Sequence, residues 1–152
     1  MDDTIETSAD AVALFRSAMP KEQDEVLVWV LPLDANGKVL EKPIVIPAGD
    51  KGAEVTLRAG AIFSAAIRAD ADKIIVAHCH PGGNPTPNKV DFAATAELID
   101  IASRLRIKLL DHLVLGSPDS ANGAGFVSMF EAMSLLRHGV VRHGVGPLWW
   151  GG

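Results

Sequence analysis

The sequence predicts an α/β fold in which a layered sheet is flanked by helices. Short runs rich in β-branched and apolar residues, typical of buried strands, are interspersed with longer segments of helical spacing. A chain of 152 residues buries about two thirds of its unfolded surface, which is enough for one core but not for two domains. No linker divides the sequence, so we expect a single domain over residues 1–152.

In the first half of the chain we expect a helix, a hairpin, a short strand and a second, Ala-rich helix. Ser8 is the candidate N-cap of the first helix, and Pro20 closes it. Asn36 and Gly37 form a type I′ hairpin signal between two apolar runs. The predicted elements are a helix at 8–19, strands at 25–33, 39–46 and 54–57, and a helix at 58–70.

The second half opens with the β-branched run 73–77, a predicted buried strand that continues to Pro81. Asn88 is the expected N-cap of the next helix, which begins at Lys89 and places Asp91 in its first turn. The predicted elements that follow are the rest of this helix to 105, a buried strand at 107–115, a polar loop at 117–125, a strand at 126–129 and a short helix at 131–137.

The most informative motif is His78-Cys79-His80-Pro81, followed by Asp91. Side chains two residues apart in a strand point to the same face, so His78 and His80 share a face and Cys79 points away, as a small core residue. Two imidazoles and a carboxylate are a three-ligand set that leaves the fourth zinc position open, as in catalytic sites. Asp91 also has a structural explanation in the first helical turn, and both roles are compatible.

The segment from His78 to Asp91 resembles the His-x-His-Pro-x-Gly-x-Pro-x-Pro-Ser-x-x-Asp signature of the RadC-like branch of the JAB/MPN (JAMM) metalloproteases. Residues 109–116 are similar to the strand that follows the motif helix in that family. The resemblance covers about residues 22–135 and leaves 137–152 as a C-terminal tail. It implies the JAB/MPN fold, a mixed central sheet flanked by helices and related to the cytidine-deaminase fold.

The resemblance also implies a function, which is hydrolysis of peptide or isopeptide bonds with Zn²⁺ held by His78, His80 and Asp91. The family's general base is an upstream glutamate, for which we choose Glu25; Glu22 and Asp24 are alternatives, and the spacing requires a bulge near Pro32. The family serine three residues before the aspartate is Asn88 here. An amide still donates a hydrogen bond, so Asn88 is a candidate contact to the oxyanion. The sequence does not determine whether catalysis with Asn88 is as efficient as with the family serine.

The alternatives to a hydrolase are two other function classes. A catalytically weak module of the same fold that binds a partner is consistent with Asn88 and with the open choice of base. A zinc deaminase requires His-x-Glu and Pro-Cys-x-x-Cys motifs. The chain has one cysteine and no His-x-Glu, which excludes the deaminase.

The composition indicates which kinds of partner and which cell compartment to expect. The net charge of −5 argues against a nucleic-acid surface. No apolar run reaches membrane length, no basic leader is evident, and one cysteine cannot form an internal disulfide. We therefore expect a soluble, cytoplasmic enzyme with a peptide or protein substrate, which includes ubiquitin-like modifiers; the oligomeric state is not determined by the sequence.

Outside the motif, three histidines and the C-terminal Gly-Gly pair are further candidates for a role at a site. His112, beside Asp111, is expected to be a core histidine, with a role near the metal as the alternative. His138 and His143 are poor ligand candidates, because nothing pairs them in a regular element. The terminal Gly151-Gly152 is interpreted as part of a surface tail; the alternative is that it mimics a Gly-Gly product in an active site.

Overall fold

The structure is a computed structural model that describes residues 3–19, 27–46 and 58–138. A five-stranded sheet in the order β2-β1-β3-β4-β5 forms its centre. Only β3 and β4 are parallel, so the sheet is mixed, and both the α/β class and the mixed sheet are confirmed. The strands are β1 Val28–Leu33, β2 Ile44–Ile46, β3 Lys73–Cys79, β4 Lys108–Leu115 and β5 Phe126–Ser128.

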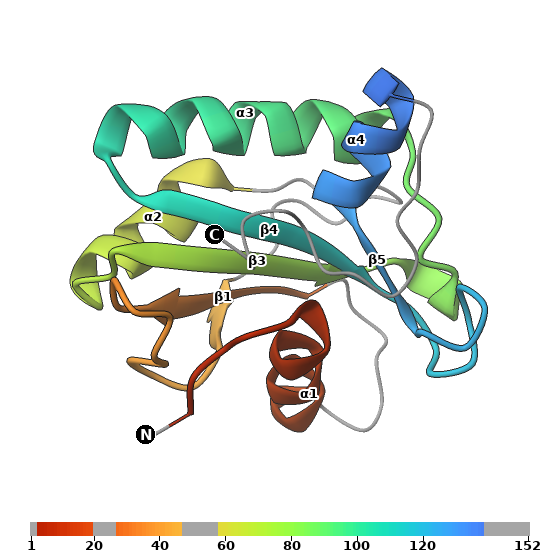
Figure 1. Cartoon of the computed structure of the whole chain (residues 1–152), viewed down its shortest axis with the longest axis horizontal. Helices are drawn as coiled ribbons and strands as arrows, with labels where there is room; N and C mark the ends of the chain where they lie inside the picture. The colour runs from red at the N-terminus through yellow and green to blue at the C-terminus, as the bar shows by residue number, and fades with distance from the viewer. Residues whose placement is uncertain (1–2, 20–26, 47–57, 139–152) are drawn as a thin grey trace.

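Helices cover both faces of the sheet (Figure 1). Helix α1 lies on one face, and α2, α3 and α4 lie on the other. A short 3-10 turn, η1 Pro81–Gly83, connects β3 to the segment that leads into α3. The helices are α1 Ser8–Ala18, α2 Ala59–Arg68, α3 Lys89–Leu105 and α4 Met129–His138. No helix in the described part of the chain is long and apolar enough to cross a bilayer.

The alternation of side chains along β1 and β3 divides the core into two apolar clusters. One cluster packs β3 residues Ile75, Ala77 and Cys79 with Phe15 of α1. The other packs residues of the opposite parity with α2 and α3; its members include Val28, Val30, Ile74, Val76, Ile62, Phe63 and Leu98. His78 continues the second set and therefore faces α3, whereas Cys79 is buried in the first cluster, as the sequence predicted.

The pairing of β3 with β4 sets which β4 side chain lies near His78. Ile74 pairs with Leu109 and Ile75 with Asp111, so Leu110 is an extra residue in β4. Val76 then pairs with His112. Because side chains two residues apart share a face, His112 lies diagonally across from His78 on the face covered by α3.

Two local predictions in the first half of the chain, a helix start and a bulge, were wrong. The N-cap of α1 is Thr7, not Ser8: Thr7 Oγ1 accepts from Asp10 N at 3.2 Å, and the Asp10 carboxylate accepts from Thr7 N at 3.0 Å. A Thr followed three residues later by Asp satisfies two backbone donors together, and Ser8 has only Ala11 at the equivalent position. The bulge expected near Pro32 is absent from the described strand, which pairs continuously with β3 from Val28 to Leu33.

The hairpin after β1 also differs from the prediction. Its turn covers residues 34–37, with Gly37 N donating to Asp34 O at 3.0 Å, and Gly37 alone has a positive φ. A type I′ turn requires positive φ at both central residues, so Asn36-Gly37 does not form one. The Asp34 carboxylate determines the turn by accepting from the backbone of Asn36 and Lys38 at 2.8 and 2.9 Å. The returning chain forms an isolated antiparallel bridge between Val39 and Leu33 and becomes a regular strand only at β2. The predicted strand 54–57 lies outside the described residues.

Candidate metal centre

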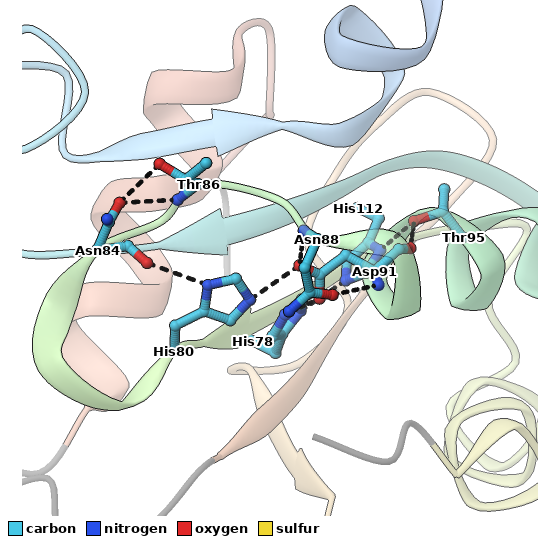
Figure 2. A network of polar contacts seen from close by, with 8 residues as sticks. All are labelled: His78, His80, Asn84, Thr86, Asn88, Asp91, Thr95 and His112. Atoms are coloured by element: carbon cyan, nitrogen blue, oxygen red, sulfur yellow. Dashed lines mark hydrogen bonds and ion pairs between the residues drawn. The ribbon is translucent and has the colours of Figure 1, made fainter. Parts of the chain in front are cut away.

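Three side chains from two elements converge at one end of β3 (Figure 2). His78 lies within β3, His80 directly follows it, and Asp91 is in the first turn of α3. Their ligand atoms all lie within 4.8 Å of one another. His78 Nε2 is 3.0 Å from Asp91 Oδ1, and His80 Nε2 is 3.0 Å from Asp91 Oδ2. The structure therefore brings together the three residues that the sequence grouped.

The start of α3 holds the Asp91 carboxylate in place. Asn88 Oδ1 accepts from Asp91 N at 2.9 Å, and Asn88 N donates to Asp91 Oδ2 at 2.8 Å. This capping box confirms Asn88 as the N-cap. The same geometry leaves both carboxylate oxygens facing the histidines, so the capping role of Asp91 is compatible with its predicted role as a metal ligand. Asn88 commits Oδ1 to the cap, and only its Nδ2 remains to donate to another molecule.

The loop between β3 and α3 is fixed by its glycines and by contact with the end of β4. Gly82 and Gly83 have φ of +85° and +79°, which side-chain-bearing residues rarely adopt. Gly83 O accepts from Ser117 N at 2.9 Å. A Cβ at Gly116 would lie 2.5 Å from Gly83 O and 2.5 Å from Pro85 Cδ, so this close approach requires glycine. The loop thus returns the chain to the sheet and places α3 over the two histidines.

His80 presents one free nitrogen to the site. Its Nδ1 donates to Asn84 O at 3.0 Å, so in the neutral ring Nε2 carries a lone pair. Nε2 is buried and has no hydrogen-bond partner in the described part of the chain, although Asp91 Oδ2 is 3.0 Å away, because the orientation does not meet hydrogen-bond geometry. Asn84 is itself held in a turn, because its side-chain Oδ1 accepts from Thr86 N at 3.0 Å and from Thr86 Oγ1 at 2.7 Å.

The electrostatics of the cluster favour a neutral imidazole beside an ionised carboxylate. Burial lowers the pKa of His78, against the opposing effect of Asp91. Burial alone would raise the pKa of Asp91, but its short contacts with His78, with the Asn88 backbone N–H and with His80 outweigh burial and lower that pKa well below its usual range. Metal binding needs histidine neutral and carboxylate ionised.

The donor set and the orphaned nitrogen fit a zinc ion. Two imidazole nitrogens and one carboxylate oxygen are a three-residue set of the kind that holds catalytic zinc, with the fourth position open. The buried, unpartnered Nε2 of His80 faces the carboxylate, where a cation would satisfy both groups. His78, His80 and Asp91 are thus the residues that could hold the metal.

Sequence reasoning left His112 open and did not single out Thr95. The His112 ring is fully buried. Its Nε2 lies 2.7 Å from His78 Nδ1, and its Nδ1 lies 2.6 Å from Thr95 Oγ1. It is therefore both a core histidine and a neighbour of the candidate metal ligands. Thr95 lies four residues after Asp91 on α3, and that spacing on one helix face is the signal that could have found it.

Asp111 is fully buried beside His112 but serves a different end of the fold. Its carboxylate accepts from Ser128 Oγ at 2.7 Å, from His112 N at 2.8 Å and from Phe130 N at 3.3 Å, which ties β4 to β5 and the start of α4. Burial raises the pKa of Asp111 to about 7 against these hydrogen bonds. The Asp111 carboxyl group therefore connects structural elements, and it takes up its proton at a higher pH than an ordinary aspartate.

The remaining site predictions fall on residues that the structure does not describe. They are Glu25 with its alternatives Glu22 and Asp24, His143, and the terminal Gly151-Gly152. The roles given to these residues stay predictions.

Comparison with known proteins agrees with the motif and the fold. The profile of the RadC-like JAB domain matches residues 5–133. The chain belongs to the RadC-like JAB domain family. A UPF0758 protein of Roseiflexus castenholzii is 36% identical over 127 residues, which cover 84% of this chain and 51% of that protein. A UPF0758 protein of Clostridium perfringens is 33% identical over 112 residues, covering 74% and 48%.

A third UPF0758 protein, from Carboxydothermus hydrogenoformans, is 38% identical over 96 residues, which are 63% of this chain and 41% of that protein. This RadC-like JAB domain thus spans about half the length of the curated relatives it matches. The family membership predicted from the motif is confirmed.

Proposed function

We propose that this RadC-like JAB domain is a zinc-dependent hydrolase of peptide or isopeptide bonds. The observation that carries the proposal is that His78 Nε2 and His80 Nε2 each lie 3.0 Å from one oxygen of Asp91, while the other nitrogen of each ring is committed to a partner within the protein. Both rings are held by these second contacts, as metal-binding histidines are.

His78, His80 and Asp91 would hold the metal. When bound there, zinc supplies Lewis acidity toward a scissile carbonyl and lowers the pKa of a coordinated water to about 7. The fixed capping box and the buried ring of His78 provide the rigid support that such a site requires.

Two further residues of this chain have proposed roles. Asn88 would donate from Nδ2 to the oxygen on which negative charge develops, because its Oδ1 is already used by the helix cap. Glu25 would accept a proton from the attacking water and return it to the departing amine. The role of Glu25 rests on the family resemblance and on its place before the strand. The proposed substrate class is a peptide or protein, and ubiquitin-like modifiers belong to that class.

A second candidate function is a partner-binding module with weak catalysis. The observation that favours it is Asn88, which replaces the family serine and commits its side-chain oxygen to the cap. In this case zinc would support the fold, and hydrolysis would be slow with every substrate.

A single comparison separates the two functions. The zinc-loaded full chain is assayed against a fluorogenic peptide library and a lysine-linked isopeptide, beside the same preparation of Asp91→Asn. Hydrolysis by the first protein and not by the second supports the hydrolase. Zinc binding by the first protein, with the same background hydrolysis by both, supports the binding module.

A further inference from the structure

A buried chain of polar contacts links the backbone of Asp91 to the ring of His78 (Figure 2). Thr95 Oγ1 donates to Asp91 O at 2.7 Å and lies 2.6 Å from His112 Nδ1. His112 Nε2 lies 2.7 Å from His78 Nδ1. The side chains of Thr95, His112 and His78 are fully buried.

The protons along this chain can be assigned in order. The Thr95 hydroxyl has one proton, which it gives to Asp91 O, so its oxygen accepts from Nδ1–H of His112. A neutral imidazole carries one N–H, so His112 Nε2 is an acceptor. His78 Nδ1–H then donates to it, and His78 Nε2 keeps a lone pair that is available to a metal lying between it and Asp91 Oδ1, 3.0 Å away.

We propose that Thr95 and His112 are positioning residues that hold His78 in the tautomer whose Nε2 can bind a metal. The inference rests on the proposed metal site. The direction of the contacts matters because the opposite direction would place a proton on His78 Nε2, where it would block a metal.

The first turn of α3 positions both the carboxylate of Asp91 and the contacts that set the tautomer of His78. The Asp91 side chain faces His78 Nε2 directly, and the Asp91 carbonyl anchors the far end of the contacts that reach His78 Nδ1. His112 is placed between them by its pairing with Val76 on the neighbouring strand. A displacement of this helical turn would therefore disturb the carboxylate and the tautomer together.

His80 reaches the same tautomer by a different route. Its Nδ1 donates to a backbone carbonyl, Asn84 O, which is an acceptor only. The partner of His78 is a side chain that can either donate or accept, so its direction has to be set by a third group. Thr95 supplies that group, and it is replaceable by mutation, which makes the inference testable.

The test compares Thr95→Val, which keeps the shape but removes the hydroxyl, with Thr95→Ser, which keeps the hydroxyl. Zinc affinity of each full chain is measured by competition with a chelator. We expect the zinc Kd of Thr95→Val to rise by about tenfold or more, as with other groups that orient metal ligands. Thr95→Ser should stay near the wild-type value. Equal affinities of the valine variant and the wild type would overturn the inference.

A second measurement needs no variant. In the zinc-free wild type, nitrogen NMR of labelled histidines should show His112 protonated at Nδ1 and unprotonated at Nε2; a proton at His112 Nε2 would overturn the inference. Failure of the wild type to bind zinc would instead contradict the proposed metal site, so the two failures are distinguishable. This experiment also decides the inference if Thr95→Val does not fold.

Discussion

His78 Nε2 lies 3.0 Å from Asp91 Oδ1, across the junction between a central strand and the first turn of a helix. Both side chains are buried, and the pKa of each is lowered, which favours a neutral ring beside a carboxylate. A neutral ring with its lone pair toward a carboxylate is repulsive unless a cation lies between them. This relationship is the physical basis of the proposed zinc site.

Replacing His80 should remove the metal without unfolding the protein. His80→Ala deletes a ligand that lies beyond the end of β3 and is partly exposed, so the core clusters remain intact. Elemental analysis of the purified variant should show loss of zinc, with a far-UV spectrum like that of the wild type. His143→Ala is the control and should keep its zinc; one equivalent of zinc in His80→Ala would remove this residue from the ligand set.

Asn88 can be tested for its two roles separately. Asn88→Ala removes the side-chain acceptor for Asp91 N and should lower the free energy of unfolding by about 1 kcal/mol, measured by urea denaturation. Asn88→Ser keeps the cap and restores the family residue, so its stability should be close to that of the wild type. Its hydrolytic rate should equal or exceed the wild-type rate. A serine variant as unstable as the alanine variant would contradict the assignment of the cap.

Glu25→Gln should keep zinc and fold while it abolishes hydrolysis. The amide preserves the size of the side chain but cannot accept a proton from water. Glu22→Gln and Asp24→Asn serve as matched controls, since both residues were alternatives for the base. Full activity of Glu25→Gln together with loss in one control would move the role to that residue.

Asp111 should make stability depend on pH. Its pKa in the folded protein is raised to about 7 by burial, so the folded state binds a proton that the unfolded state has released above its ordinary pKa near 3.8. The contribution of Asp111 protonation to the free energy of unfolding is therefore fully present below that ordinary pKa, and it is lost as the pH rises through about 7.

Asp111→Asn keeps an acceptor for the backbone amides of His112 and Phe130 but removes the titration. The unfolding free energies of wild type and variant, compared from pH 4 to pH 8 at about unit intervals, should diverge in favour of the variant as the pH rises. A difference that stays constant over this range would contradict the raised pKa.

Local signals in the sequence were sufficient for the motif and its elements. The β-branched run before His78 predicted β3, and the pair Asn88 and Asp91 predicted the start of α3, because strand alternation and capping act over a few residues. The hairpin after β1 was mispredicted because the Asp34 carboxylate competes with the Asn36-Gly37 signal for the same backbone amides.

The contact between His112 and His78 was out of reach for a different reason. It depends on the parallel register of β3 and β4, which the extra residue Leu110 shifts by one position. Register between strands distant in sequence is set by packing of the whole sheet, and no local pattern around His112 reports it.

The proposed metal site is tested most directly by crystals of the zinc-loaded full chain, with anomalous differences measured at the zinc absorption edge. We expect one strong peak bounded by His78 Nε2, His80 Nε2 and the Asp91 carboxylate, with a fourth position open to solvent or substrate. A stoichiometric zinc peak at any other group of residues, or no peak at these three, would contradict it.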